Sequence, residues 1–94
     1  MGDRVSAVKD TTLFIHCPFK GFPYPRVTWF RNGKVIDHVK YENIDILEPD
    51  GLSKLRILKL DKEHEGSYRC VAFNVYGRKQ ATAQVRQIGK FVIT

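Results

Sequence analysis

The sequence lacks any long hydrophobic run. Hydrophobic residues make up 43% of the 94 positions, but charged and small residues interrupt them throughout, and no apolar stretch follows Met1-Gly2-Asp3 as in a signal peptide. A membrane-spanning helix needs about 20 consecutive, mostly apolar residues. We therefore expect neither a signal peptide nor a membrane span, and no direct membrane contact of this domain; if the natural protein is secreted, the chain is a piece of it.

Patterns typical of enzymes and metal sites are also missing. The three histidines, His16, His38 and His64, are far apart and form no His-x-x-x-His pair, and no carboxylate pair stands at ligand spacing. No serine lies in a nucleophile elbow, and no glycine-rich loop precedes a helical segment. The sequence thus predicts no catalytic residue, no metal and no cofactor, and we expect the protein not to be an enzyme.

Cysteine is scarce, and the two present are Cys17 and Cys70. Their spacing is too long for a zinc knuckle or a CxxC redox pair and suits a bridge between two sheets. In the chain-entropy model such a bridge disfavours the unfolded state by about 4 kcal/mol. Two cysteines without a third favour a disulfide and an oxidising compartment, while a buried reduced pair in the cytosol stays open. The absence of an Asn-x-Ser/Thr sequon favours the intracellular alternative.

Basic residues outnumber acidic ones by 16 to 10, so the formal net charge is +6. This excess favours solubility and acidic partners. The lysines and arginines are spread along the sequence rather than gathered in one stripe, which is typical of solvated strand faces. We therefore expect no nucleic-acid partner.

Apolar residues recur with a period of two, and turn residues follow about every ten positions, which is typical of an all-β domain. No window shows helical spacing. Asn32-Gly33 predicts a hairpin because both residues accept positive φ. In the segment after the turn at residues 49–51, Leu55, Ile57 and Leu60 are expected to face inward. Strands are expected at residues 5–8, 12–18, 27–30, 34–36, within 39–47, and at 53–60, 67–74 and 79–85.

Five motifs follow this strand pattern in order. They are Gly-Phe-Pro-Tyr-Pro-Arg-Val-Thr-Trp at 21–29, Asn-Gly at 32–33, Leu-Arg-Ile at 55–57, Gly-Ser-Tyr-Arg-Cys at 66–70 and Ala-Phe-Asn-Val-Tyr-Gly at 72–77. Together they resemble the I-set immunoglobulin (Ig) domains. The resemblance implies an all-β, immunoglobulin-like antiparallel sandwich of two sheets, named ABED and A'GFCC' after their strands. It also implies a single I-set domain over residues 1–86, with residues 87–94 as a C-terminal extension or a linker to a following domain.

The same resemblance assigns the core of the domain. It places Cys17 on strand B and Cys70 on strand F, joined as a disulfide between the sheets, with Trp29 beside them. The hydroxyl of Tyr68 is expected to donate a hydrogen bond to backbone upstream, at the corner between strands E and F.

The sequence departs from the family at His64. Relatives usually carry an aspartate there, which forms a buried ion pair with an arginine, and Asp61 or Glu65 is a candidate replacement. We expect His64 to be a solvated or hydrogen-bonded corner residue, and an acid-sensitive switch is the less favoured alternative.

A narrower resemblance lies in residues 13–23, Leu-Phe-Ile-His-Cys-Pro-Phe-Lys-Gly-Phe-Pro. A cysteine followed by proline and an aromatic residue, and then Gly-aromatic-Pro, is similar to the Ig domains of the Dscam cell-adhesion receptors, including the shortened arthropod forms. This resemblance implies homophilic recognition between like molecules on apposed cells, through a sheet face.

Outward apolar residues are the candidates for such a contact, because the outer faces of an isolated sandwich should be polar. On the ABED sheet we expect a patch with an apolar centre and a charged rim, completed by Lys54 and one of Ile44 or Ile46. The candidate protein-binding residues of this ABED face are Phe14, His16, Arg56 and Leu58.

The A'GFCC' sheet offers an alternative binding face, with the candidates Phe30, Val71 and Phe73. For both faces an equally favoured explanation is cross-strand stability without any partner. The Dscam resemblance favours the ABED face, where a symmetric pairing sets each patch against its own copy.

Two further segments carry apolar residues outside the strands. The aromatic residues Phe22, Tyr24 and Tyr76 are expected near one end of the sandwich, where they contact a neighbouring domain or pack within the loops. Residues 87–94 retain a strand-like pattern that includes Phe91 and Ile93. We expect a truncated connection to a second domain there; extension of the edge strand or pairing with another copy are the alternatives.

These observations predict a non-enzymatic recognition module, an extracellular Ig domain of a cell-surface adhesion receptor. Its expected partners are proteins: a second copy of itself in a weak homodimer, and neighbouring Ig domains of the parent chain. The alternative is an intracellular structural Ig module of a giant muscle or cytoskeletal protein.

Overall fold

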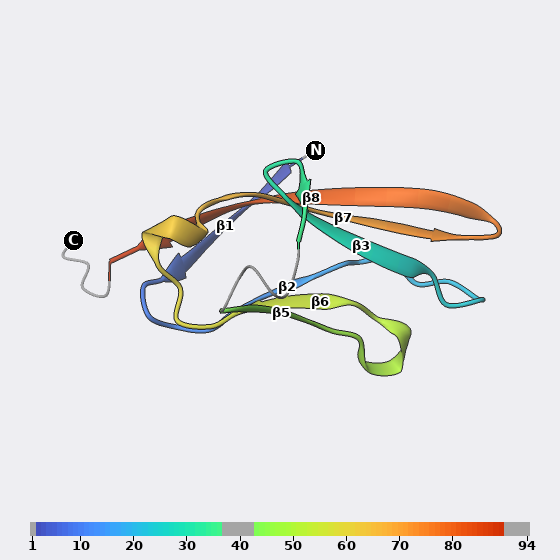
Figure 1. The fold of residues 1–94 in the computed structure, drawn as a ribbon, viewed down its shortest axis with the longest axis horizontal. Helices are drawn as coiled ribbons and strands as arrows, with labels where there is room; N and C mark the ends of the chain where they lie inside the picture. The colour runs from blue at the N-terminus through green and yellow to red at the C-terminus, as the bar shows by residue number, and fades with distance from the viewer. Residues whose placement is uncertain (1, 37–42, 90–94) are drawn as a thin grey trace.

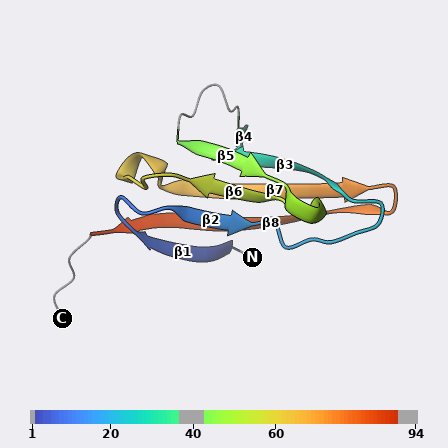
Figure 2. The same cartoon turned by 90° about the horizontal axis from the view of Figure 1, so that it is seen from below.

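The computed structural model describes residues 2–36 and 43–89, whose strands form two sheets packed face to face (Figures 1 and 2). Apart from the strands, the described residues contain two short 3-10 helices, η1 (Pro49–Gly51) and η2 (Lys62–His64). The predicted all-β sandwich is confirmed. The strands are β1 (Gly2–Val8), β2 (Leu13–His16), β3 (Arg26–Arg31), β4 (Lys34–Val35), β5 (Ile44–Leu47), β6 (Lys54–Ile57), β7 (Gly66–Asn74) and β8 (Gly77–Ile88).

The two sheets differ in size. One has five strands in the order β1-β8-β7-β3-β4, and the other has three in the order β2-β6-β5. The larger sheet is the expected A'GFCC' sheet, in which β1 runs parallel to β8 with Val5 opposite Val85. The smaller sheet carries strands B, E and D without the expected strand A, because in the described chain β1 pairs only with β8 while Val5 and Ala7 pack against the core from there.

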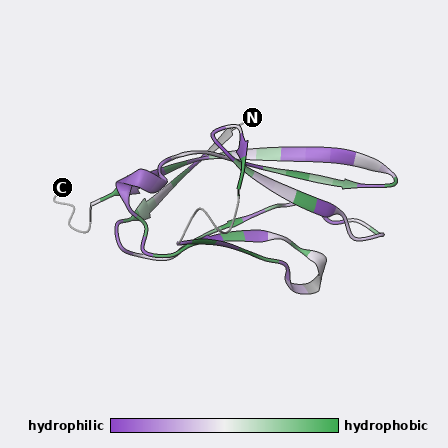
Figure 3. Cartoon of the chain, in the orientation of Figure 1, coloured by the Kyte–Doolittle hydropathy of each residue, from purple (hydrophilic) through white to green (hydrophobic). Residues whose placement is uncertain are grey.

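The core lies between the sheets and follows the alternation of the sequence. Bands of hydrophobic and hydrophilic residues alternate along the strands (Figure 3). As predicted, Leu55, Ile57 and Leu60 are buried, and so is the inward row of β7, which contains Tyr68, Cys70 and Ala72. Period-two burial on both sheets fixes which side chains face outward.

The turns decide where the strands end. Asn32 and Gly33 have φ of 50° and 84°, so the predicted hairpin is confirmed between β3 and β4. The strand expected over residues 53–60 is shorter, because Lys59 adopts φ of 55° and β6 ends at Ile57. The expected turn at residues 49–51 is the helix η1.

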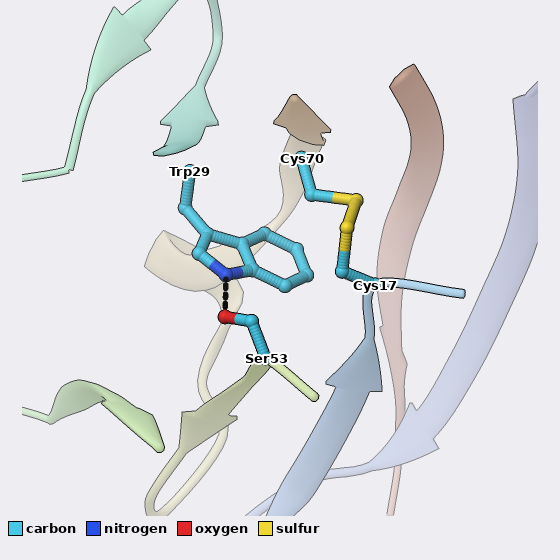
Figure 4. The surroundings of a disulfide bond; sticks show 4 residues. All are labelled: Cys17, Trp29, Ser53 and Cys70. Atoms are coloured by element: carbon cyan, nitrogen blue, oxygen red, sulfur yellow. Dashed lines mark hydrogen bonds between the residues drawn. A yellow bond between two sulfur atoms is a disulfide. The ribbon is translucent and has the colours of Figure 1, made fainter. Parts of the chain in front are cut away.

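The predicted disulfide joins Cys17, just after β2, to Cys70 of β7 with a Cα–Cα distance of 5.9 Å (Figure 4). Trp29 lies beside it, and its indole Nε1 donates a buried hydrogen bond to Oγ of Ser53 at 2.8 Å. The carbonyl of Ser53 accepts a bond from the backbone N–H of Cys17 at 2.9 Å. Ser53 therefore links Trp29 of the larger sheet to the smaller sheet through Cys17. The sequence did not reveal this role.

The last strand runs further than the expected end at residue 85. Gln87 and Ile88 continue β8 and pair with Ala7 and Val8 of β1. The N–H of Gln87 also donates to the carboxylate of Glu65 at 3.0 Å. Two residues of the expected extension are thus part of the sheet, while the expectations for Phe91 and Ile93 lie outside the described residues.

Candidate functional site

The corner before β7 holds the predicted tyrosine bond. Tyr68 is buried, and its hydroxyl donates to the backbone carbonyl of His64 at 2.6 Å. This bond confirms the corner that the resemblance implied. It fixes the start of β7, on which Val71 and Phe73 are presented.

His64 itself is buried at 5% exposure and is hydrogen-bonded rather than solvated. Its Nδ1 accepts the backbone N–H of Asp61 at 2.9 Å, so this nitrogen carries no proton in the folded state. Burial lowers the pKa of His64 below its ordinary value, and the adjacent Arg31 adds to this lowering against the opposing carboxylates. The carboxylates of Asp61 and Glu65 accept backbone N–H groups, and Arg31 donates to the carbonyl of Glu63.

The outer side of the three-stranded sheet brings the first candidate set together. We call the surface formed by Phe14, His16, Asp45, Lys54, Arg56 and Leu58 the BED face. Strand register places Phe14 of β2 and Asp45 of β5 on either side of Arg56 of β6, and His16 opposite Lys54. Side chains opposite one another on one face lie within contact distance, so Phe14, His16 and Arg56 belong to a continuous surface, and Leu58 follows just past the end of β6.

The centre of the BED face is an ion pair. Arg56 donates from Nε to Oδ1 of Asp45 at 2.9 Å and from its NH2 group to Oδ2 at 2.5 Å. This bidentate hydrogen bonding raises the pKa of Arg56, and the negative charge of Asp45 acts in the same direction. The expected apolar centre is therefore wrong: because β6 is the middle strand, Arg56 occupies the centre and the apolar residues flank it.

The isoleucines of β5 do not take part in this face. Ile44 is buried and Ile46 is packed against the core, so the expectation that one of them faces outward is wrong. Both lie at inward positions of the alternation, and Asp45 between them takes the outward position. The signal for Asp45 was present in the Ile-Asp-Ile pattern, which has one polar residue between two apolar ones.

The apolar residues of the BED face are substantially exposed. Phe14 is 43% and Leu58 is 36% exposed, and His16 is exposed at the edge. The ammonium group of Lys54 lies 5.0 Å from the centre of the Phe14 ring, within the range of a cation–π contact. The ring is therefore oriented by a neighbour and yet remains accessible.

The alternative candidates lie on the outer side of β3 and β7, which we call the GFC face. Phe30 is partly buried. The guanidinium of Arg69 lies 4.5 Å from the centre of its ring. Val71 is half-buried as well. Phe73, at 44% exposure, is the accessible member of this set and lies near the end of the strand.

The aromatic loop residues gather at one end, as predicted. The β2–β3 loop and the β7–β8 hairpin reach the end of the sandwich opposite the end of β8 (Figure 1). Phe22, Tyr24 and Tyr76 in these loops are exposed. The side-chain Nδ2 of Asn74 joins the two loops by donating to the carbonyl of Pro23 at 3.1 Å.

Across residues 2–36 and 43–89, no group of three or more His, Cys, Asp or Glu side chains is arranged to hold a metal ion. The same residues include no helix that is long and apolar enough to cross a membrane.

Comparison with known proteins gives several matches of similar strength. Neural cell adhesion molecule 1 of Gallus gallus is 37% identical over 97% of this chain and 8% of its own length. Muscle M-line assembly protein unc-89 of Caenorhabditis elegans is 33% identical over 92% of this chain and 1% of its own length. Papilin of Mus musculus is 33% identical over 96% of this chain and 7% of its own length. The chain thus spans only a small part of these curated relatives.

Solved structures and a family model agree on the kind of domain. The titin domains z1z2, solved in complex with telethonin, match with a TM-score of 0.82 and 31% identity over 94% of this chain and 45% of that one. The model of the immunoglobulin I-set domain matches residues 2–86. The relatives named above include an adhesion molecule and a muscle protein. The chain belongs to the immunoglobulin I-set family, whose domains are non-enzymatic.

Proposed function

We propose that this chain is a recognition domain of an extracellular cell-adhesion receptor and that it binds a second copy of itself through the BED face. The observation that carries the proposal is the exposure of Phe14 and Leu58 on one sheet face. Phe14 of β2 is opposite Arg56 of β6, and Leu58 lies just past the end of β6, two residues beyond Arg56. Diagonal neighbours lie within reach of an aromatic ring, so a partner can cover both at once.

The ion pair on this face supports its use as an interface. Covering a lone arginine would leave a buried charge without a partner, which is strongly unfavourable. Asp45 binds Arg56 in a bidentate arrangement on the same surface. A second copy can therefore cover the centre of the BED face without burying an unpaired charge.

Symmetry suits a face of this kind. In a two-fold antiparallel pairing the same patch serves both partners, so Phe14 can pack on Phe14 of the other copy. The apolar area is modest and each copy carries a formal charge of +6, so a single contact is weak. Many copies on apposed membranes strengthen such contacts through effective concentration.

The cysteines support an extracellular compartment. A disulfide between Cys17 and Cys70 is typical of oxidising, extracellular surroundings. The similarity to neural cell adhesion molecule 1 agrees with this assignment. The similarity of residues 13–23 to the Dscam receptors also agrees with it, but this subtype depends on that stretch alone.

A second candidate function is that of a structural module in an intracellular muscle or cytoskeletal protein. The match to Muscle M-line assembly protein unc-89 over 92% of the chain favours it. The two candidates differ in the state of Cys17 and Cys70, since a cytosolic module keeps them reduced. Intact mass with and without reductant, on protein purified from its native source under thiol-blocking conditions, decides between them: blocked thiols contradict the adhesion proposal.

Sedimentation velocity tests self-association. Phe14 and Phe73 form a matched pair on opposite sheets, with exposures of 43% and 44%. We expect the wild type to dimerise at about 100 μM, Phe14→Asp to be monomeric, and Phe73→Asp to dimerise like the wild type. A wild type that stays monomeric at about 1 mM contradicts homophilic binding by this domain. Loss of dimers in Phe73→Asp alone assigns the contact to the GFC face.

A further inference from the structure

A second surface of the domain carries aromatic residues that the core does not use. Residues 18–26 and 72–79, which we call the loop end, meet at one end of the sandwich (Figure 1). Phe22 is 87% and Tyr76 is 83% exposed there, and Val75 is as open. Apolar side chains gain free energy only when they leave water, so these residues contribute little to the folded domain by themselves. Their exposure calls for an explanation outside the core.

The loop end carries a shallow, open groove. A groove of about 630 Å³ opens between its two segments, with Phe22 and Phe73 among the apolar residues that line it. Lys20, Arg78 and Lys79 also line the groove, and among the described residues no acidic side chain does. A concave surface with apolar walls and charge of one sign is suited to a partner of the opposite sign.

The two segments that form this groove are held together. The side chain of Asn74 donates to the carbonyl of Pro23 and accepts the N–H of Tyr76 at 2.8 Å. Gly21 lies so close that an added Cβ would come within 3.0 Å of the Asn74 side chain. The groove is therefore pre-formed, which reduces the entropy lost when a partner binds.

Phe73 is the centre of a charged row at the edge of the groove. Strand register places Arg26 of β3 and Arg78 of β8 directly opposite Phe73 of β7, on the outer side of the sheet. Both arginines are exposed, and no carboxylate within residues 2–36 or 43–89 forms an ion pair with either. An exposed phenylalanine with an arginine opposite it on each neighbouring strand fits a partner that carries carboxylates on both sides of an apolar group.

We propose that the loop end binds an acidic segment of another protein, in which an apolar side chain covers Phe73 and flanking carboxylates bind Arg26 and Arg78. Arginine binds carboxylates through two parallel hydrogen bonds, and arginine and aromatic residues dominate the binding energy of protein interfaces. A sulfated polysaccharide would satisfy the basic groups but leave Phe22 and Val75 in water. An apolar side chain on a peptide covers such residues as well, and this favours a protein partner.

This surface is independent of the BED face. Its row lies on strands β3, β7 and β8 of the larger sheet, whereas Phe14 and Arg56 lie on the smaller one. Both surfaces can therefore be occupied at once, and substitutions on one serve as controls for the other. Failure of self-association leaves the loop-end proposal standing, and the reverse also holds.

The test uses the 94-residue chain and a fluorescein-labelled peptide of about a dozen residues in which glutamate alternates with leucine, measured by fluorescence anisotropy. We expect saturable binding that weakens as salt increases, because exposed charges are screened. Arg26→Gln and Arg78→Gln are each expected to weaken binding by about tenfold through a lost charge-assisted hydrogen bond. Phe73→Ala should lose about tenfold through lost apolar contact.

Matched controls keep the result specific. Phe14→Ala, an equally exposed phenylalanine on the other sheet, and Arg86→Gln, an exposed arginine elsewhere on β8, should stay within about twofold of wild type. Circular dichroism of each variant confirms that the sandwich is intact. Equal losses in the control variants, or equal binding of the peptide with lysine in place of glutamate, overturn the proposal.

Two rival ligands, and the absence of binding, give distinct outcomes. Binding of heparin oligosaccharide without binding of the glutamate–leucine peptide assigns the surface to sulfated polysaccharides and overturns the proposal. A glutamate–serine peptide that binds as tightly shows that charge alone suffices, which overturns the apolar contact. No binding of the glutamate–leucine peptide at about 1 mM overturns the proposal as a whole.

Discussion

Replacing Ser53 with alanine tests the part of the core that the sequence did not reveal. Ser53 is 3% and Trp29 is 2% exposed, so their hydrogen bond is closed off from water. The substitution removes the hydroxyl that accepts the indole N–H at 2.8 Å. The backbone carbonyl of Ser53, which accepts the N–H of Cys17, is unchanged. The variant therefore isolates a single side-chain bond next to the disulfide.

The expected loss follows from the unpaired donor. A buried polar group left without a partner costs about 1–3 kcal/mol, and the deleted oxygen leaves only a small void. A domain of this size has a free energy of unfolding of about 5–14 kcal/mol, so the loss is a large share of it. The midpoint of thermal unfolding should fall by about 4–8 °C for each kcal/mol.

Urea unfolding followed by the fluorescence of Trp29 measures the change. Ser6→Ala on β1, an exposed serine, is the control and should stay within about 0.5 kcal/mol of wild type. In the Trp29→Phe background, Ser53→Ala should cost much less, because no indole N–H remains to be left unpaired; circular dichroism follows this pair. A loss below about 0.5 kcal/mol for Ser53→Ala alone refutes the reasoning and shows that the indole bond contributes nothing.

Four further outcomes are expected. The pKa of His64 is lowered in the folded state, so the unfolded chain binds more protons at acidic pH. The stabilisation is complete above pH about 6.5 and is lost as the pH falls below it. Urea midpoints at a series of pH values measure this loss, and the same pH dependence in His64→Gln would contradict it. Asp45→Asn leaves the charge of Arg56 without its carboxylate and should weaken the BED-face dimer by about tenfold in sedimentation. Normal dimerisation of this variant would show that the partner copy does not cover the ion pair. Reduction of the bond between Cys17 and Cys70 should lower the free energy of unfolding by about 2–4 kcal/mol in urea titrations with and without reductant, and equal midpoints would contradict a stabilising bridge. Added salt should strengthen self-association and weaken binding of the acidic peptide, and a shift of both in one direction would contradict the charge argument.

The sequence predicted the inside of the domain well because local pattern and core position coincide there. Trp29, Tyr68 and Cys70 occupy inward positions of regular strands, Cys17 continues the alternation just after β2, and each lies in the core where it was expected. Asn32-Gly33 fixed its turn through backbone preference alone. Where one-dimensional alternation dictates burial, the prediction was confirmed.

Contacts between residues far apart in the sequence were harder to predict. The contact between Ser53 and Trp29 joins residues 24 positions apart, and nothing in the sequence around a serine shows that it will meet an indole. The Ile-Asp-Ile pattern signalled an outward Asp45, but its pairing with Arg56 depends on the register of β5 against β6. The absence of strand A from the smaller sheet was missed for the same reason. The alternation of Val5 and Ala7 fits either sheet, and only the pairing of β1 with β8 assigns them to the larger one.

The distribution of charge separates the two proposed surfaces. A net charge of +6 opposes any contact between identical copies and attracts acidic partners. On the BED face Asp45 neutralises the central arginine, Arg56, so two identical copies can meet there with little charge repulsion. At the loop end Arg26 and Arg78 have no such carboxylate in the described chain, so an identical copy would meet its own charge. The distribution of charge therefore favours the proposed self-recognition on the smaller sheet and the proposed acidic partner at the end of the larger one.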